Sequence, residues 1–462
     1  MKSNNRNTHH PKPRTFGAAS SGLLALVAIT VTLAASSWAA SSEKVLYNFQ
    51  DGADGAAPMS GLISDAHGNL YGTAFIGGEF GAGTAFRLTQ NKNGSWTETT
   101  IYSFQGNLNG TADGGGPAAG LVFDDAGNLY GTTTAGGANP PISDGTVFKL
   151  TPTKSGEWKE TILHSFNCTE GKGDSDGCSP NSYLIFDKAG NLYGTTLKGG
   201  GGGAFTTFCQ NGCGSVFKLA PNKDGSWTES LIHTFPNGDG GTPDGQNPYA
   251  GLLLDDSGNL YGTTWVGGPD DEGVIFRLSP ESKGKWKETV LFHFHDLVND
   301  PPDGANPYAG LIMDKAGNLY GTTRDGGGKV GGYGVVFQLT PTAKGEWKEK
   351  VIHAFPTPRY RDGELLMTGV IADAAGNLYG AAPFGGGKQE PECGDYDGCG
   401  VVYKLSPNSN GTWIETILYA FQGGSDGGEP LPDRLLIDSK GNLFGTTFAG
   451  GLGAGTVFEI KQ

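Results

Sequence analysis

Gly127-Asn-Leu-Tyr-Gly-Thr-Thr133 lies between a turn and a glycine-rich loop, and it recurs along the chain with almost no change. Every copy keeps Gly-Asn-Leu, then an aromatic residue, then Gly. The seven copies begin at Gly68, Gly127, Gly190, Gly258, Gly317, Gly376 and Gly441, at intervals of 59, 63, 68, 59, 59 and 65 residues. Self-similarity at this period is typical of folds in which each repeat is one supersecondary unit.

Each repeat has the content of a four-stranded propeller blade. Around Gly127 we predict strands over Gly120–Asp124, Leu129–Thr133, Gly145–Leu150 and Trp158–Phe166. The segments between them hold Gly, Asn, Asp and Pro, which supply the positive or fixed φ that turns need. The strands themselves hold β-branched and aromatic residues.

The count of fourth strands indicates a closed ring. A tryptophan opens the fourth strand in six repeats, at Trp96, Trp158, Trp227, Trp286, Trp347 and Trp413. The last repeat stops after its third strand, Gly455–Ile460, whereas Glu43–Phe49 matches the missing strand in register. Pairing of the N-terminal strand with Thr456–Ile460 would leave no free sheet edge. We therefore predict an all-β, seven-bladed β-propeller over residues 40–462, with four-stranded antiparallel blades.

At these residues the chain resembles the bacterial GloVer (Gloeobacter/Verrucomicrobia-type) tandem-repeat family, whose hallmark is GNLYGTT followed by GG and then GTVFKL. The resemblance covers essentially all of residues 40–462. It implies an exported β-propeller of the kind that often carries one of several anchoring tails, and it supplies no catalytic residues. We expect no anchoring tail here, because the chain stops at Phe458-Glu-Ile-Lys-Gln462.

The N-terminus is typical of a secretory signal peptide. Four basic residues precede a 13-residue apolar stretch from Leu23 to Ala35, and Ser37 and Ala39 fit cleavage after Ala39. A membrane-spanning helix needs about 20 apolar residues, so we expect removal of residues 1–39 rather than anchoring. The expected product is exported, periplasmic or secreted, monomeric, and without a membrane span.

Composition excludes one class of partner. Loss of four basic residues with the signal peptide changes the formal net charge from −15 to −19. A chain this acidic repels phosphate backbones, so we expect no nucleic-acid partner.

Six cysteines form three close couples: Cys168 with Cys178, Cys209 with Cys213, and Cys393 with Cys399. The even number, the local spacing and an oxidising destination predict three disulfides. Zinc is the alternative, but nearby histidines and CxxC spacing are lacking.

Histidines give no catalytic or metal set. His164, His233 and His353 share a fourth-strand position that other repeats fill with Tyr or Phe, which indicates a ring-packing position. We assign no catalytic residue and no metal ligand from the sequence.

An Asp-Gly pair recurs in each blade-to-blade loop. Its aspartates are Asp54, Asp113, Asp176, Asp244, Asp303, Asp362 and Asp426. Asp-Gly can serve to make the turn alone. The alternative is binding of a cation or of sugar hydroxyls near the channel mouth. We expect no cofactor; calcium is the one ion with partial loop motifs, at Asp174-Ser-Asp-Gly177 and Asp395-Tyr-Asp-Gly398, both without the distal Glu.

One face of the propeller should carry the function, because strand order puts the loops of variable length, the cysteines and the Asp-Gly pairs on the same side. Just after the second strand, one position changes from repeat to repeat: Phe75, Thr134, Leu197, Trp265, Arg324, Pro383 and Phe448. Loop irregularity can produce such variation. Alternatively, Phe75, Trp265 and Phe448 offer aromatic faces to a sugar ring, and Arg324 offers a charged donor.

The sequence therefore predicts an exported binding or interaction module, with a glycan, a protein or another envelope component as its ligand. The alternatives are a carbohydrate-active lyase or hydrolase that uses carboxylates of the same loops, and a purely structural scaffold. A glycosidase needs two convergent carboxyl groups, and no such pair stands out in the sequence.

Overall fold

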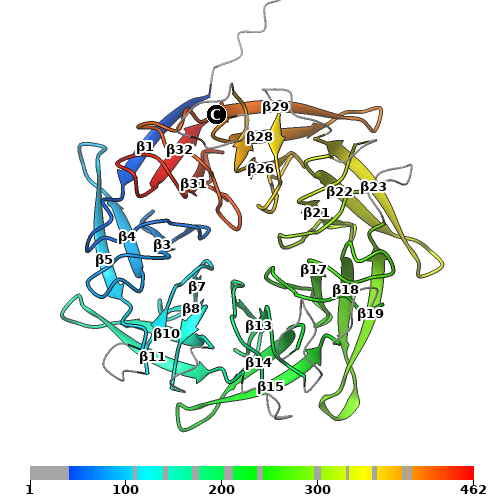
Figure 1. Ribbon diagram of the computed structural model, residues 1–462, viewed down its shortest axis with the longest axis horizontal. Coiled ribbons are helices and arrows are strands. Elements are labelled where there is room, and N and C mark those ends of the chain that lie inside the picture. The colour runs from blue at the N-terminus through cyan, green and yellow to red at the C-terminus, as the bar shows by residue number, and fades with distance from the viewer. Residues whose placement is uncertain are drawn as a thin grey trace, which may run out of the picture. The chain divides into compact units, whose positions relative to one another are not determined.

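The computed structural model describes residues 41–107, 112–138, 144–168, 176–201, 212–236, 243–295, 303–328, 332–355, 362–387, 393 and 398–462. The predicted signal peptide, residues 1–39, lies outside these ranges. The described chain forms seven four-stranded antiparallel sheets arranged as blades around one axis (Figure 1), and the centre of this ring is called the channel below. This confirms the predicted seven-bladed β-propeller.

In each blade, one strand lies nearest the channel and the other three follow it outwards. The innermost strands are β2 (Ile63–Ser64), β7 (Val122–Phe123), β12 (Ile185–Phe186), β16 (Leu253–Leu254), β20 (Ile312–Met313), β25 (Ile371–Ala372) and β30 (Leu436–Ile437). The second strands are β3 (Leu70–Ala74), β8 (Leu129–Thr133), β13 (Leu192–Thr196), β17 (Leu260–Thr264), β21 (Leu319–Thr323), β26 (Leu378–Ala382) and β31 (Leu443–Thr447).

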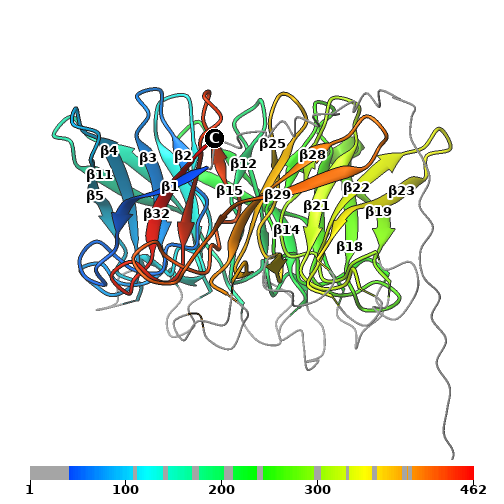
Figure 2. The same ribbon diagram turned by 90° about the horizontal axis from the view of Figure 1, so that it is seen from above.

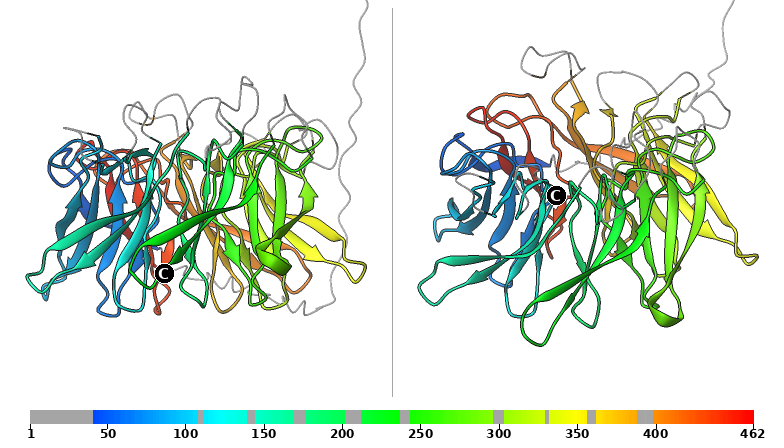
Figure 3. Two further views of the ribbon diagram at one scale, coloured as in Figure 1. Left: turned by 90° about the horizontal axis from the view of Figure 1, so that it is seen from below. Right: turned by 60° about the horizontal axis from the view of Figure 1, so that its bottom comes forward.

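The outer half of each blade holds the longer strands. The third strands are β4 (Thr84–Gln90), β10 (Thr146–Pro152), β14 (Ser215–Pro221), β18 (Val274–Pro280), β22 (Val335–Pro341), β28 (Val401–Pro407) and β32 (Thr456–Lys461). The outermost strands are β1 (Ser42–Asn48), β5 (Trp96–Ser103), β11 (Trp158–Ser165), β15 (Trp227–Thr234), β19 (Trp286–His293), β23 (Trp347–Ala354) and β29 (Trp413–Ala420). Seen from above and from below the view of Figure 1, these outermost strands slope across the outside of the ring (Figures 2 and 3).

The innermost strands are shorter than predicted, with two residues in place of five. Their first residues turn towards the channel instead of pairing; the N–H of Gly120, for example, points at the carboxylate of Asp433, with an N···O distance of 3.4 Å. Two short ladders were also not predicted, β6 (Gly114–Gly115) with β9 (Ala135–Gly136) and β24 (Gly363–Glu364) with β27 (Phe384–Gly385). A 3₁₀ turn covers Ser282–Gly284.

The recurring turn is held by one aspartate. In the second repeat, Asp124 accepts hydrogen bonds from the backbone N–H of Asn128 (2.8 Å), its side-chain amide (2.7 Å) and the hydroxyl of Tyr130 (3.0 Å). Gly127 supplies the positive φ of 81° that the turn requires. Although burial opposes ionisation, these hydrogen bonds lower the pKa of Asp124. The Gly-Asn-Leu-Tyr motif therefore builds its turn from its own side chains.

The rest of the motif packs within its own blade and against the neighbouring blades. A Cβ atom on Gly131 would lie 2.6 Å from the ring of Phe148, so only glycine lets this third-strand ring approach. The hydroxyl of Thr132 donates to the carbonyl of Ser182 in the next blade (3.0 Å). The Trp158 ring packs edge-on against Tyr71 of the preceding blade. The repeated residues thus make equivalent contacts around the ring.

Strand β1 closes the ring as predicted. It pairs antiparallel with β32, from Ser42 opposite Lys461 to Asn48 opposite Thr456. The next residue, Phe49, is fully buried and contacts the Phe86 ring of the first blade, with ring centroids 5.1 Å apart. Both ends of the described chain therefore belong to one sheet (Figure 1).

Candidate functional site

Each blade-linking segment makes a left-handed corner before its innermost strand. At Asn247, where φ is 56°, the N–H donates to the Cys213 carbonyl of the preceding blade (2.7 Å), and the carbonyl accepts the N–H of Trp265 (3.0 Å). The equivalent corners, all at φ between 52° and 63°, are Ala57, Gly116, Ser179, Asn306, Leu365 and Glu429. A positive φ costs free energy in residues other than glycine. Because every repeat has this conformation at its corner, the corners direct the chain into the channel in the same way in each blade.

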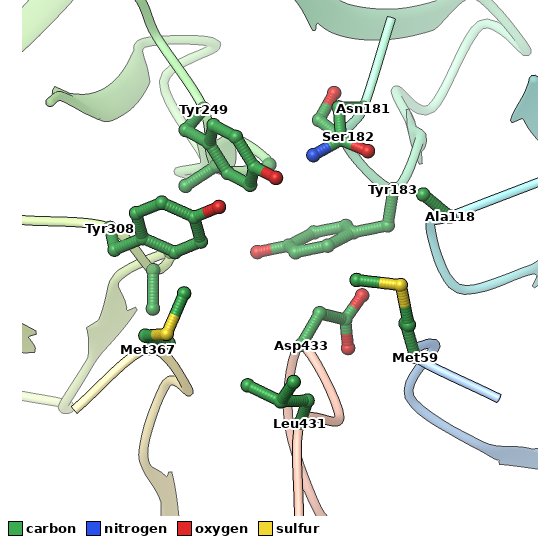
Figure 4. Close-up of a pocket in the computed structure, with 14 residues that line it drawn as sticks. Met59, Ala118, Asn181, Ser182, Tyr183, Tyr249, Tyr308, Met367, Leu431 and Asp433 are labelled. Atoms are coloured by element: carbon green, nitrogen blue, oxygen red, sulfur yellow. The ribbon is translucent and has the colours of Figure 1, made fainter. Parts of the chain in front are cut away.

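The residues that follow these corners enclose a pocket in the channel (Figure 4). Its space amounts to about 610 Å³, part of it open to solvent. Every repeat contributes to the wall, with Met59, Ala118, Tyr183, Tyr249, Tyr308, Met367 and Asp433 as one residue from each. The pocket therefore exists only in the closed ring.

Tyr183 crosses the channel. It occupies a position that is glycine in five repeats, at Gly61, Gly120, Gly251, Gly310 and Gly369. Its side chain is buried, and a Cβ atom added to Gly251 would lie 2.4 Å from its ring. The guanidinium carbon of Arg434 lies 4.5 Å from the ring centroid, which is cation–π geometry. Glycines of neighbouring repeats thus make room for one tyrosine.

Asp433 reaches the pocket through an insertion. Five residues separate the corner Glu429 from the buried Leu435, whereas four separate Asn247 from Leu252 in the fourth repeat. The carbonyl of Asp433 accepts the N–H of Gly369 (3.0 Å), and its Oδ1 is shielded from solvent without a well-formed hydrogen bond among the described residues. Burial raises the pKa of the Asp433 carboxyl, against the opposing effects of Arg434 and of nearby backbone N–H groups.

Two further tyrosines complete the aromatic wall. The rings of Tyr249 and Tyr308 lie 3.9 Å apart between centroids, at 33° to each other. Burial, and then contact with Tyr249, raise the pKa of Tyr308. Figure 4 shows Tyr183 entering the pocket from the side opposite to Tyr249 and Tyr308, with the hydroxyl ends of all three pointing toward one another and the thioethers of Met59 and Met367 below them. Asp433 is the single carboxylate among the described residues that line this wall.

The variable-position residues Phe75, Trp265, Arg324 and Phe448 lie outside the pocket wall. Arg324 forms an ion pair with Asp325 (3.3 Å), and its charge acts on the hydroxyl of Tyr308. The Phe75 ring packs over Gly116, where an added Cβ atom would lie 3.0 Å from Cε2. Saccharide binding by these residues stays a prediction.

The Asp-Gly aspartates are engaged within the loops. Asp113 accepts hydrogen bonds from the Tyr102 hydroxyl (3.0 Å) and from the N–H of Gln105 (2.7 Å). Tyr47 with Asp54 and Tyr419 with Asp426 repeat this contact, and the rings of His164 and His295 contact Asp176 and Asp303. At Asp244 and Asp362 the carboxylate acts electrostatically on His233 and His353. These partners belong to or follow the outermost strands, so these carboxylates lie towards the outside of the ring instead of at the channel mouth.

A second carboxyl group faces each of these aspartates from the outermost strand of the next blade. In sequence the group is the Glu two residues after each strand-opening Trp, with Glu43 as its counterpart in β1. Burial, and in addition the neighbouring aspartate, raise the pKa of Glu160 and Glu415 to about 8 and that of Glu43 to about 7. The full set is Glu43, Glu98, Glu160, Glu229, Glu288, Glu349 and Glu415. These seven Asp–Glu pairs, one at each blade junction, are called the junction carboxyls below.

The predicted disulfides are borne out where the structure describes them. Cys168 is bonded to Cys178, and Cys393 to Cys399. Cys213 is also disulfide-bonded, and its predicted partner Cys209 lies outside the described residues. Asp144, Cys168 and Cys178 are close enough together to hold a metal, but both sulfurs are consumed by the disulfide.

Reduction should loosen the loops without unfolding the blades. Each of these disulfides closes a short loop, and loss of one costs about 2–4 kcal/mol in stability. We expect the double replacement Cys393→Ser with Cys399→Ser to lower the melting temperature by a few degrees while the far-ultraviolet circular dichroism keeps its β spectrum. Loss of that spectrum would show that the disulfides hold the blades themselves.

Four residues of this wall were not predicted from the sequence, namely Tyr183, Tyr249, Tyr308 and Asp433, although the sequence carries a signal for two of them. Tyr183 stands in a position that is glycine in most repeats, and the last repeat carries one extra residue before Leu435. Departures from a repeat can be seen without a structure. Their convergence in one pocket cannot, because residues 183 and 433 lie 250 positions apart.

Solved structures similar to this chain have low sequence identity. A protein from Lactobacillus plantarum matches at 12% identity over 79% of this chain and 86% of its own, with a TM-score of 0.46. PorZ, a surface component of the type-IX secretion system of Porphyromonas gingivalis, matches at 15% over 82% of this chain and 43% of its own, with a TM-score of 0.39. A luciferin-regenerating enzyme matches at 13% over 83% and 98%, with a TM-score of 0.40. No curated protein matches the sequence.

The sequence profile of one repeat family covers nearly all of the propeller. The Gloeobacter/Verrucomicrobia repeat matches residues 30–208 and again residues 203–458. Within the described ranges, the chain has no helix with the length and apolarity to cross a membrane. Because both matches include the recurring Gly-Asn-Leu-Tyr segment and its blades, the chain belongs to the Gloeobacter/Verrucomicrobia repeat family.

Proposed function

We propose that this protein is an exported binding module that holds a small ligand in the channel pocket. One observation carries the proposal: Tyr183 and Asp433, which both depart from the repeat, lie in the wall of the same pocket. Stability alone would favour apolar side chains there, because removing a carboxylate from water costs free energy. A free-energy cost of this kind at one place in a regular scaffold is expected where that place binds a ligand.

Two further observations support this reading. The variable residues Trp265 and Arg324 act on the segments that form the pocket wall: the N–H of Trp265 donates to the corner Asn247, and the charge of Arg324 acts on Tyr308. The disulfides agree with a location outside the cytoplasm, where thiols are oxidised. For the alternative of a lyase or hydrolase, the described wall offers Asp433 as its one carboxylate, which favours binding over catalysis.

Recognition of a saccharide by the variable-position residues Phe75, Trp265, Arg324 and Phe448, called the rim below, is the second candidate. Trp265 is partly exposed and Arg324 is about one-third exposed, so a sugar ring and its hydroxyls could reach both. The two candidates place the ligand against different side chains, which makes them separable by substitution.

A ligand screen with three variants tests the proposal. Small amines, saccharides and peptides are screened by thermal shift, and each hit is titrated by calorimetry. For a pocket ligand we expect Tyr183→Leu to weaken binding at least about tenfold, and Trp265→Ala with Phe75→Ala to change it little. Ile414→Ser, on the outer strand β29 and 52% exposed, is the control.

The opposite ranking, with Trp265→Ala harmful and Tyr183→Leu neutral at unchanged melting temperature, would support the rim candidate and reject the pocket. No hit in any class, or hits that no variant affects, would contradict the binding function.

A further inference from the structure

We propose that the channel pocket is an aromatic cage for a small alkylated ammonium ion. This inference rests on the proposed binding function and names its ligand class. It follows from the kinds of side chain in the wall, from their arrangement and from one carboxylate.

Ring faces are the first requirement of such a site. Three tyrosines from consecutive repeats, Tyr183, Tyr249 and Tyr308, border the same space (Figure 4). The face of an aromatic ring carries negative electrostatic potential and attracts a cation within about 6 Å of its centroid. Arg434 already lies at 4.5 Å over Tyr183 from outside the pocket wall, so this ring accepts a cation in the present structure.

A soft apolar surround is the second requirement. Met59, Met367 and Leu431 complete the wall, and thioethers adapt to irregular shapes. Methyl groups on nitrogen would bury their apolar surface against these side chains. A bare metal ion finds no comparable fit, because calcium takes about 6–8 oxygen ligands and the described wall has one carboxylate.

The countercharge is the third requirement. Asp433 has its Oδ1 shielded from solvent and without a well-formed hydrogen bond among the described residues. Arg434 compensates part of the charge of Asp433. Its guanidinium lies over the Tyr183 ring, outside the pocket wall. The carboxylate lies at the edge of the pocket in Figure 4, so an ammonium ion bound there would lie beside it. The net charge of the chain, −15, also favours the arrival of cations.

A neutral saccharide fits this wall less well. Sugar recognition needs several polar side chains aimed at hydroxyls. The described wall does offer polar side chains, namely the three tyrosine hydroxyls, Asn181, Ser182 and Asp433, but a neutral ligand would bring no charge to meet the Asp433 carboxylate.

The test compares choline with 3,3-dimethylbutan-1-ol, which has the same shape but carbon in place of the charged nitrogen. Calorimetric titration of the whole chain should give at least about tenfold tighter binding of choline. Glycerophosphocholine, as a third ligand, distinguishes a lipid headgroup from the free amino alcohol, and binding of either supports the cage.

Two variants locate the effect. Asp433→Asn should reduce choline affinity about tenfold or more and leave the uncharged analogue unchanged, whereas Tyr183→Leu should weaken choline most. Asp256→Asn removes the same charge at a side chain that is 97% exposed and should change neither ligand. If Asp433→Asn fails to fold, the two-ligand comparison on the unaltered chain still decides.

Equal affinity for choline and its analogue, or no choline binding at millimolar concentration, would overturn the cage. In that event a saccharide or peptide hit that depends on Tyr183 would leave the proposed binding function standing, whereas the absence of any hit would reject both.

Discussion

A chain that begins at Asp51, without strand β1, is expected to melt about 10 °C lower than the chain with β1, or to lose cooperative unfolding. The deletion removes the buried side chains of Leu46 and Phe49 and all pairing with β32. Loss of two such core side chains costs roughly 4–10 kcal/mol, before the exposed sheet edge is considered. Thermal unfolding followed by circular dichroism measures the effect.

A matched pair of point substitutions separates closure from ordinary packing. Phe49 and Phe104 are equivalent and fully buried, and each contacts the third-strand Phe of the next blade at 5.0–5.1 Å between centroids. If β1 is as firmly integrated as β5, then Phe49→Ala and Phe104→Ala should lower the melting temperature equally.

Adding a synthetic peptide of residues 41–50 to the shortened chain should restore part of the lost stability by refilling the gap. An unchanged melting temperature after the deletion would mean that pairing of β1 with β32 contributes little to the ring.

The second large effect is expected from the junction carboxyls: the melting temperature should fall by several degrees between pH 6.5 and pH 8.5. Burial, and with it the adjacent aspartates, raise the pKa of these glutamates to about 7 or 8, whereas in the unfolded chain they ionise near 4.5. Over this window the folded state therefore holds protons that the unfolded state has already lost. Stability falls with rising pH wherever the folded state binds more protons, so the sign is negative.

Other titrating groups limit the pH range in which the junction glutamates dominate the change in stability. Burial lowers the pKa of His233 and His353, which works in the opposite direction below about pH 6.5. The turn aspartates, such as Asp124, have lowered pKa values and lose their contribution only in acid, below their ordinary range near 3.8. Between pH 6.5 and 8.5 the junction glutamates therefore dominate the change.

Glu160→Gln tests the assignment at one junction. The amide keeps the shape and cannot ionise, so the variant should melt higher than the unaltered chain at pH 8.5 and show a smaller pH dependence. Glu157→Gln, three residues earlier and exposed, is the control and should leave the profile as it was. A flat profile in the unaltered chain would contradict the junction carboxyls as a source of pH sensitivity.

Much of the fold could be predicted because its signals are local and repeated. The Asp124 turn is completed within seven residues, so its hydrogen bonds depend on nothing distant. Strand β8 has the predicted bounds, Leu129–Thr133, since this turn precedes it and a glycine-rich loop follows. The closing strand could be predicted equally well, because the sequence shows that the last repeat lacks a fourth strand.

Only the closed ring decided the candidate site. Whether Tyr183 points into the channel depends on the course of the segment that precedes β12, and the room for its ring depends on Gly251 and Gly310 in other repeats. The pairing of Asp113 with Glu160 likewise depends on the angle between blades, which no local pattern encodes. By itself the sequence determined the number of blades, their strands and their closure, because turn chemistry and alternation act over a few residues. The tertiary structure alone decided which residues share the pocket and the junctions, because curvature around the ring brings together positions that are hundreds of residues apart.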